Sequence, residues 1–359
     1  MYFMSYTIKA AERPVYKLNT PDLGILFHSV IENFSKTLQK DGITWDNVTQ
    51  DDIYKIIADS VKTGLSSFNN GILVSSYTMK YLMSRFSRVS SRAVNTLINH
   101  VKKGSFAPFA FEVNFGNGGL APIVIDLGNS RRMFLTGKID RVDIMESDGK
   151  LYVKIIDYKS GSKSFSLQDI YYGLQLQLMI YIDAIIKSGI FRDKTPLPGG
   201  VFYFKIQDPV AKTTEELSFD DIKELIEKQL KMSGLVLMDE NVIRAMDNSF
   251  EKKSDIIPVS YKADGSISQS SYTASEKDFL SIMDYCRHKA TSIGNEILKG
   301  NIAPEPYVKG QTMPCSYCAY KSVCDFDREN IRGRFLKALN KDEALEKINN
   351  EINPEKTEV

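Results

Sequence analysis

Two acidic residues and a lysine stand at the ends of neighbouring β-like runs, where they could bind a metal ion. Asp140 closes the run "TGKID", Asp157 lies in "VKIIDYK", and Lys159 follows two residues later. Side chains two apart on a strand share a face, so Asp157 and Lys159 point the same way, and Asp140 on the preceding strand can lie beside them. Paired carboxylates are costly unless a cation lies between them, and oxygen ligands suit Mg²⁺ or Mn²⁺. These residues predict a metal site.

The chemistry expected of such a site is hydrolysis at phosphorus. A bound metal lowers the pKa of a coordinated water and neutralises charge that builds on a phosphoryl oxygen, so water is the candidate nucleophile. Lys159 could orient or deprotonate that water. Gln177 and Tyr181 follow at helical spacing i, i+4 and could support the site from one helix face. For Tyr181 an ordinary place in the helix core is an equally good interpretation.

Three cysteines crowd into ten residues, at Cys315, Cys318 and Cys324, and the one other cysteine is Cys286. No apolar run follows a basic start, and none reaches the ~18 residues of a membrane span, which indicates a soluble intracellular protein. In a reducing compartment, cysteines at short spacing predict a metal centre rather than disulfides. Zinc and iron with sulfide are rival occupants.

A helix expected from Ser275 onward carries Cys286 on its apolar stripe. Such a buried free cysteine behaves as a small hydrophobe, so Cys286 is not expected to complete the cysteine centre. The stripe consists of Phe279, Met283, Cys286, Ala290, Ile293 and Ile297.

Charge is balanced overall, with a net charge of +1, but it is unevenly distributed. No Asp or Glu occurs between Val61 and Phe111. Within that stretch Arg85, Arg88 and Arg92 step at i, i+3, i+7, which places them on one helical face that could follow a phosphate backbone. Taken alone, a solvated basic face is the better interpretation.

The elements that must position these residues alternate between helix and strand, which predicts an α/β fold. Thr20 and Pro21 open a helix whose apolar residues recur at helical spacing to Leu38. Residues 106–159 carry strand-like runs separated by turn residues, which predict an antiparallel meander. One helix is expected over residues 166–189, opened by a capping-box pattern at Ser166 and Asp169, and a buried strand follows at "GGVFYFKI".

The motifs resemble a known nuclease family. "GKIDRVD", "IIDYKSGSKSF" and "YYGLQLQLMIYIDA" are similar to the motifs of the RecB-like branch of the PD-(D/E)xK nucleases, above all to the C-terminal nuclease of the AddB family of helicase-nuclease subunits. "ERPVYKLNTPDLGILFHS", "GGVFYFKIQDP", "LKMSGLVLMDENVIRAMD" and "PCSYCAYKSVCDFD" carry the same resemblance to about Asp327. It implies a restriction-endonuclease-like core, a mixed sheet flanked by helices, with helical elaborations at both ends and a cysteine loop.

The resemblance also implies roles for individual residues. His28, Asp140 and Asp157 match the family's Mg²⁺ ligands, Lys159 its catalytic lysine, and Gln177 with Tyr181 its Q-x-x-x-Y motif, which contacts DNA. From the sequence alone His28 is a half-buried helix histidine, and only the resemblance makes it a ligand.

Cys315, Cys318 and Cys324 match three of the four ligands of the family's iron-sulfur cluster (4Fe-4S). The fourth is expected just upstream of Met1, so the cluster is expected to be incomplete in this chain, which resembles an N-terminally truncated family member. No G-x-x-x-x-G-K-[ST] loop occurs, so the chain has no ATP site of that kind.

The expected function is that of a bacterial, cytoplasmic, Mg²⁺-dependent exonuclease acting on the 5′-terminated single strand of DNA, with an AddA-like helicase-nuclease partner, in double-strand-break repair. Two alternatives remain: a catalytically silent DNA-binding or scaffold module, and a CRISPR-associated RecB-like exonuclease. The expected divisions are a helical part with a basic face (1–104), the nuclease core (105–210), a mostly helical insertion and helix (211–300), the cysteine loop (301–330) and a charged helix with a disordered tail (331–359).

Overall fold

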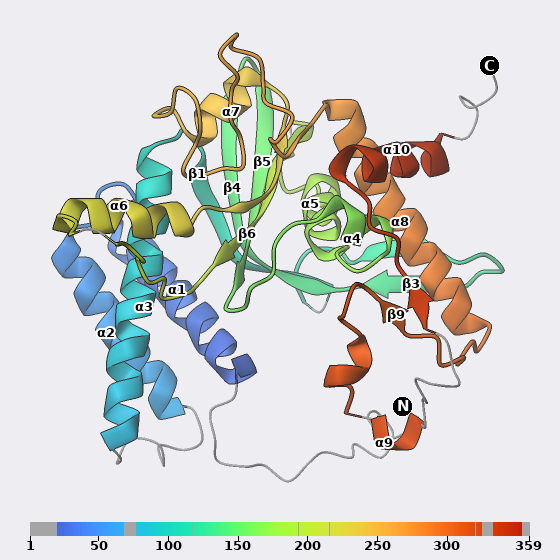
Figure 1. Ribbon diagram of the computed structural model, residues 1–359, viewed down its shortest axis with the longest axis horizontal. Helices are drawn as coiled ribbons and strands as arrows, with labels where there is room; N and C mark the ends of the chain where they lie inside the picture. Colours follow the sequence, from blue (N-terminus) through green and yellow to red (C-terminus); the bar gives the residue numbers. More distant parts are fainter. Residues whose placement is uncertain are drawn as a thin grey trace.

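A six-stranded mixed sheet forms the centre of the molecule in the computed structural model (Figure 1). The structure describes residues 20–67, 77–116, 118–192, 194–214, 216–319, 321–324 and 333–353. Along the sheet the order is β1-β4-β5-β6-β7-β8, with parallel pairing at β5/β6 and β7/β8 and antiparallel pairing elsewhere. The predicted mixed sheet flanked by helices is therefore confirmed. The strands are β1 (Ala107–Phe115), β4 (Gly137–Ser147), β5 (Lys150–Lys159), β6 (Pro196–Lys205), β7 (Ser233–Leu237) and β8 (Thr273–Ala274).

One face of the sheet is covered by the N-terminal helices α1 (Thr20–Asp41), α2 (Gln50–Ser67) and α3 (Tyr77–Lys102), together with the short helix α7 (Glu240–Met246). The apolar stripe predicted for α1 is buried there, with Val30 and Phe34 fully enclosed. Helix α6 (Phe219–Gln229) lies outside this layer and has no buried residue.

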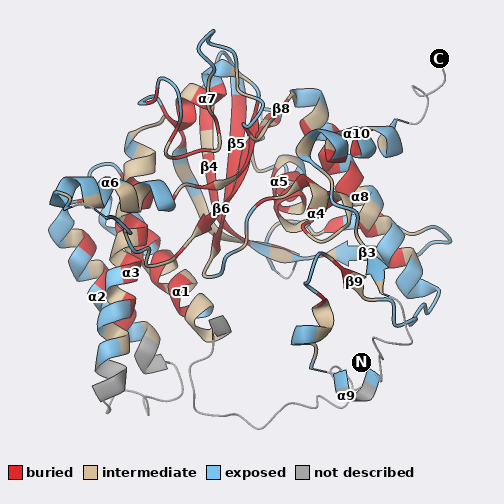
Figure 2. Ribbon diagram, in the orientation of Figure 1, coloured by how far each residue is buried: buried red, intermediate tan, exposed pale blue. Residues whose placement is uncertain are grey.

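The opposite face is covered by α4 (Leu167–Tyr171), α5 (Gln177–Lys187), α8 (Glu276–Leu298) and α10 (Lys341–Ile352). Within β5, Ile156 belongs to the first core and Ile155 to the second, because successive side chains of a strand alternate between faces. A strand covered on both faces is apolar along most of its length. In Figure 2 β4 and β5 are buried along most of their length, between the two helical layers.

Three charged side chains are buried in the first core. Arg141 Nε donates to Asp143 Oδ1 at 2.6 Å, and Lys154 Nζ lies 2.9 Å from Asp143 Oδ2. The Arg141 guanidinium lies over the Trp45 ring, 4.6 Å from its centroid, and Lys154 lies 4.9 Å from the centroid of Phe106. Two cations thus share one carboxylate, and each also lies against an aromatic ring.

The single helix predicted for residues 166–189 is wrong, because the chain turns in its middle. Ser166 caps α4 as expected, its side chain accepting from the Asp169 N–H. Gly173 then takes a positive φ of 77°, and Gln175 turns back to donate to the carbonyl of Ser164 at 2.8 Å. The helix resumes as α5 only at Gln177. A left-handed glycine ends a helix in this way.

The predicted antiparallel meander is correct only for β1, β4 and β5. Strands β2 (Ile123–Asp126) and β3 (Arg132–Leu135) pair with each other in a separate two-stranded sheet. Strand β7 in the region expected to be mostly helical was also missed, because a short apolar run has no periodicity that separates strand from helix.

The stripe predicted for α8 is buried through Phe279, Cys286 and Ala290, so the core position of Cys286 is confirmed. The stripe is wrong at its end, where Ile293 is 43% and Ile297 68% exposed. In Figure 1 the last turns of α8 extend away from α10.

The cysteine segment follows α8. It contains β9 (Tyr307–Val308), a 3₁₀ turn (Pro314–Tyr317) and α9 (Lys321–Cys324), and β9 pairs with β10 (Arg334–Phe335). The expected disordered tail after residue 353 and the motif "ERPVYKLN" lie outside the described residues. Among the described helices, none combines the length and the apolar character needed to cross a membrane.

Candidate active site

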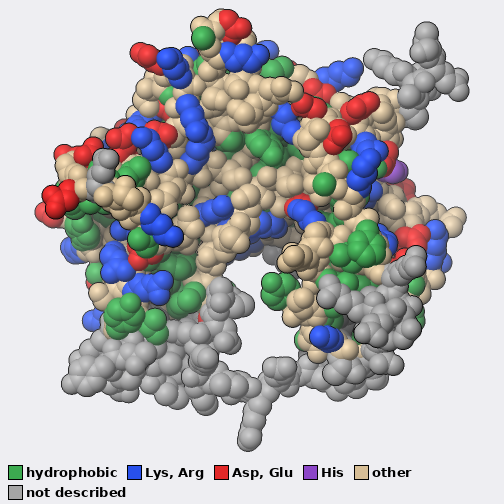
Figure 3. Space-filling model, viewed as in Figure 1, with side chains coloured by type: hydrophobic (Ala, Val, Ile, Leu, Met, Phe, Trp, Pro, Cys, Tyr) green, Lys and Arg blue, Asp and Glu red, His purple; other side chains and the backbone are tan. Residues whose placement is uncertain are grey.

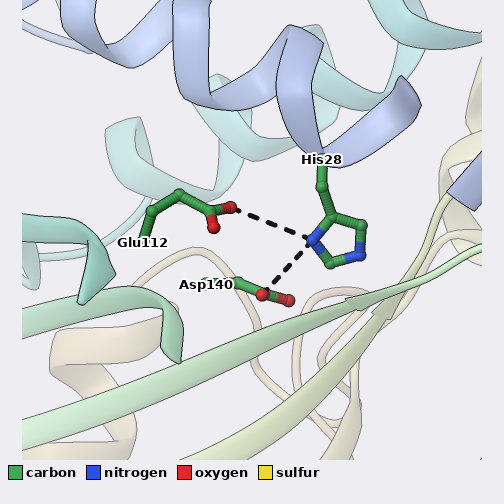
Figure 4. A group of neighbouring side chains, drawn as sticks. All are labelled: His28, Glu112 and Asp140. Carbon is green, nitrogen blue, oxygen red and sulfur yellow. Dashed lines mark ion pairs between the residues drawn. The ribbon is translucent and has the colours of Figure 1, made fainter. Parts of the chain in front are cut away.

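His28, Glu112 and Asp140 converge from three different elements (Figure 4). Nδ1 of His28 lies 3.3 Å from Asp140 Oδ1 and 3.9 Å from Glu112 Oε1. One ligand atom from each residue lies within 4.8 Å of the others, so the three could hold one metal ion. Two carboxylates with one imidazole match the oxygen preference of Mg²⁺ and Mn²⁺, with a nitrogen donor added.

The backbone of β5 orients two of these three side chains, Asp140 and His28. The Tyr158 N–H donates to Asp140 Oδ2 at 2.6 Å, and the Tyr158 carbonyl lies 3.1 Å from His28 Nε2. Since a carbonyl oxygen only accepts, Nε2 carries the hydrogen and Nδ1 is the atom turned toward the carboxylates. A hydrogen bond that fixes the imidazole in this way is typical of metal-ligating histidines.

The acids around His28 favour the cationic form of its imidazole. Burial by itself lowers its pKa, but the hydrogen bonds and charges of Asp140 and Glu112 outweigh burial and raise the pKa of His28 to about 10. A metal ion would take the place of that proton between the same acids. The site is therefore built for a positive charge.

Glu112 is a candidate ligand that was not among the residues predicted from the sequence. It lies on β1 opposite Asp140, since Phe111 pairs with Arg141 and Val113 with Ile139. Its carboxylate also contacts Lys138 Nζ at 2.5 Å, and these neighbours hold the pKa of Glu112 below its usual range although burial raises it. Its φ of 51° is strained for a residue other than glycine. The strand pattern "FEVNF" carries the acid, but only the β1/β4 register assigns it to the site.

Asp157 and Lys159 lie beside this cluster on β5 and form an ion pair. The pairing of Arg141 with Ile156 brings Asp157 next to Asp140 across the two strands. Burial and the negative charge of Asp140 raise the pKa of Asp157 to about 6, against the opposing effect of Lys159. The Asp157 carboxylate is outside the three-residue group, so the structure places it as a neighbour of that group.

Gln177 and Tyr181 approach from α5, on the other side of the sheet. Gln177 Nε2 donates to the Tyr181 hydroxyl at 2.7 Å, and the Tyr181 ring packs edge-on against Phe115 with 5.8 Å between centroids. Burial raises the pKa of Tyr181, and the charges of Asp157 and Asp140 raise it further. Tyr181 thus belongs both to the helix core and to the surroundings of the site.

A cavity of about 490 Å³ opens over the cluster. Helix α1 passes close to the end of β5 there, since a Cβ on Gly24 would lie 3.2 Å from Ser160 Oγ. The cavity is lined by Gly24, Ile25, His28, Ser29, Glu32, Glu112, Lys138, Asp140 and Ser160.

The arginine face of α3 is partly neutralised. Arg88 Nη2 lies 2.7 Å from Asp208 Oδ2, and Arg92 forms an ion pair with the other oxygen of the same carboxylate. Arg85 lines a neighbouring cavity instead. Figure 3 shows Lys and Arg side chains spread over the viewed face, including the part of it near α3 and α6.

The cysteine segment stands apart from this cluster. Cys315 and Cys318 are half-buried and Cys324 is exposed. Among the described residues, the only group of three with its ligand atoms gathered is the one around His28, so the three thiols are not gathered into a site. Cys286 is enclosed in the second core, where burial raises the pKa of its thiol and opposes the thiolate that a metal needs.

A family model described as the PD-(D/E)XK nuclease superfamily matches residues 1–325, and the chain belongs to this superfamily. The chain is also similar to the B subunit of ATP-dependent helicase/deoxyribonuclease (AddB). The identity is 43% over 356 residues with the subunit of Alkaliphilus metalliredigens, covering 98% of this chain and 31% of the relative. With that of Clostridium botulinum it is 42% over 357 residues, covering 96% and 30%. The chain thus spans about a third of the length of these relatives.

Proposed function

We propose that the chain is the nuclease part of an AddAB-type helicase-nuclease and hydrolyses phosphodiester bonds of DNA with Mg²⁺ or Mn²⁺. The observation that carries the proposal is the convergence of His28, Glu112 and Asp140 beneath an open cavity, with Asp157 and Lys159 alongside. This is the donor set of a hard divalent cation combined with a lysine that can act on water or phosphate.

Each residue of the site has a proposed role. His28, Glu112 and Asp140 hold the cation, and Asp157 beside Asp140 is proposed as a further ligand. His28 and Asp140 are already oriented by the backbone of Tyr158. The bound cation supplies charge neutralisation at the phosphate and a more acidic water. The Lys159 ammonium, held beside Asp157, orients the attacking water or stabilises charge on the phosphate oxygens. Gln177 and Tyr181 support the site and face the nucleic acid.

The substrate proposed is the 5′-terminated single strand, degraded as an exonuclease during double-strand-break repair in the bacterial cytoplasm. An AddA-like subunit would deliver that strand. Arg85, Arg88 and Arg92 are proposed to contact DNA, with Arg85 the most available because Asp208 holds the other two. The divisions of the chain near residues 104, 210, 300 and 330 stay predictions.

The three cysteines of the loop are proposed to bind part of an iron-sulfur cluster. Their C-x₂-C-x₅-C spacing and their surface position suit a cluster that is completed by a ligand from elsewhere. The buried Cys286 does not suit that role. No catalytic step is assigned to the cluster, and its expected role is to tie two segments of the chain together.

Cleavage of a 5′-labelled single-stranded oligonucleotide by the 359-residue chain, with Mg²⁺, Mn²⁺ or EDTA, tests the proposal. Asp157→Ala should abolish metal-dependent cleavage and leave the melting temperature within a few degrees of the wild-type value. The matched control is Asp220→Ala, at an exposed acid on α6, which should cleave normally. Cleavage that survives Asp157→Ala would contradict the site, and DNA binding without any cleavage by the wild type would favour the silent module.

A further inference from the structure

A second cavity, of about 380 Å³, adjoins the cavity over His28, Glu112 and Asp140. It lies between α1 and α3, over the ends of β5 and β6, and Ser160 lines both cavities. Helix α1 serves both, because Leu23 and Phe27 face this cavity while Gly24 and His28 face the other. A ligand that extends out of the metal site therefore meets the second cavity next.

The walls of this cavity are mainly apolar. Phe27 and Phe86 stack with 4.2 Å between their centroids, and both line it. The other apolar lining residues are Leu23, Leu26, Leu82, Val89 and Ile206. The polar contributions come from Ser160, Gln207, Asp208 and Arg85. Apolar and aromatic walls with a few polar groups are typical of sites for small planar ligands, whose cavities range over ~300 to 1,000 Å³.

The charges around the cavity favour an anionic ligand. Asp208 is the acid on its wall, and it is already paired with both Arg88 and Arg92, which hold the pKa of its carboxyl below the usual range although burial raises it. Arg85 has no ion pair within the part of the chain that the structure describes. The three guanidinium groups of Arg85, Arg88 and Arg92 outnumber the one carboxylate, Asp208, so the edge of this apolar cavity carries a net positive charge.

We propose that this cavity holds one unstacked nucleobase of the DNA strand, next to the scissile phosphate, with Arg85 on a flanking phosphate. The inference rests on the proposed nuclease function and adds a site to it. A base stacked and paired in a duplex cannot enter, whereas a single strand can turn a base onto apolar and aromatic side chains. The cavity would thereby restrict cleavage to unpaired strands, without reading the sequence.

An abasic scan of the substrate tests the proposal directly. Oligonucleotides with one abasic position, moved stepwise from the 5′ end, are compared for KM and for single-turnover cleavage by the 359-residue chain. One position should raise KM by roughly 5- to 150-fold, the range that base stacking on a protein supplies. Leu23→Trp, which fills the cavity, should bind intact DNA more weakly and lose this dependence on position. Leu280→Trp, at an exposed site on α8, is the matched control and should keep it.

The arginine is tested through salt dependence. Arg85→Gln should lower the slope of log K against log salt by about 0.7, the value for one phosphate contact on a single strand, while Arg85→Lys restores it. Arg132→Gln, at an exposed arginine on β3, should leave the slope unchanged. Binding is measured with Ca²⁺ in place of Mg²⁺, so that the DNA stays intact.

The outcomes separate this inference from the proposed function. If Asp157→Ala abolishes cleavage but the abasic profile of the wild type is flat, the nuclease function stands and the base site is wrong. If Leu23→Trp lowers the melting temperature, Leu82→Trp on the opposite wall is used. A flat profile together with destabilisation by both variants would assign the cavity to packing of the chain itself and overturn the proposal.

Discussion

Asp140 accepts a hydrogen bond of 2.6 Å from the backbone N–H of Tyr158, so the strand that carries Asp157 also holds the carboxylate of its neighbour. The carbonyl oxygen of Tyr158 accepts a hydrogen bond from His28 Nε2. The backbone of Tyr158 thus orients two candidate ligands from two different elements. Orientation of this kind lowers the ordering cost of binding a metal.

Asp140→Asn should separate metal binding from folding. The amide oxygen can still accept from Tyr158, so the melting temperature should stay near the wild-type value, whereas a ligand charge is lost. We expect Mn²⁺ affinity by calorimetry to fall by more than the roughly 10- to 100-fold that loss of a residue orienting a ligand costs. Asp220→Asn should leave the affinity unchanged. Unaltered Mn²⁺ binding by Asp140→Asn would remove this residue from the ligand set.

The strained backbone at Glu112 predicts an inverted order of stability between two variants. Glu112→Ala and Glu112→Gly both remove the carboxylate and should both lose metal-dependent cleavage. Because φ is 51° at this position, glycine should be more stable than alanine by about 1 kcal/mol, the reverse of its usual effect in a strand. Urea unfolding of the two variants measures this difference. A more stable alanine variant would show that the strand relaxes once the carboxylate is gone.

The buried charges Arg141, Asp143 and Lys154 predict opposite effects of two substitutions. Asp143→Asn leaves two buried cations without their acid and should cost on the order of 3 to 5 kcal/mol in the free energy of unfolding. Lys154→Met removes the surplus cation and should be neutral or stabilising. Denaturant unfolding measures the free energy of unfolding of both variants and so tests the two predicted effects. Strong destabilisation by Lys154→Met would mean that both cations are required.

His100, near the end of α3, predicts a loss of stability in acid. Its ring is half-buried and its Nδ1 is enclosed without a hydrogen-bond partner. Burial, together with the charges of Lys154 and Arg141, lowers the pKa of His100 to about 3. Between pH 6.5 and about 3 the unfolded chain therefore binds a proton that the folded chain does not, so stability is kept above pH 6.5 and lost as the pH falls.

Replacing His100 by Leu should remove this acid sensitivity. The stability difference between pH 7.5 and pH 5 should shrink by about 2 kcal/mol, measured by urea unfolding at both values. His288→Leu, on α8, is the control, and it should retain the full pH dependence. An unchanged pH dependence in the His100 variant would show that the ring is protonated in the folded protein.

The cysteines predict a division between iron content and stability. After anaerobic reconstitution, Cys315→Ser should lower bound iron and the visible absorbance band, because it removes a thiolate on the loop. Cys286→Ala should leave iron unchanged and cost about 1 kcal/mol in stability, as a buried side chain does. Loss of iron in the Cys286 variant would make that residue a ligand after all.

Features set by local spacing could be predicted from the sequence. The ion pair of Asp157 with Lys159 follows from the period of a strand, and the burial of Cys286 from that of a helix. Glu112 could not be assigned to the site, because its place depends on the β1/β4 register. The ion pair between Arg88 and Asp208 joins residues 120 positions apart, so no local sequence pattern could predict it. The break before α5 does have a local signal in the sequence, the glycine at position 173.

Helix α1 imposes a constraint on how this protein can evolve. It presents His28 to the metal cluster and Phe27 to the apolar cavity, in consecutive positions of the same rigid turn. Each residue of an α-helix advances by about 100°. Inserting one residue between Thr20 and Ser29 would therefore rotate the side chains on one side of the insertion by about 100° relative to those on the other side, and some of them would leave their cavities. Point substitutions can change either cavity separately. Because Phe27 and His28 are adjacent in the sequence, an insertion or deletion before them in α1 should disturb both cavities at once.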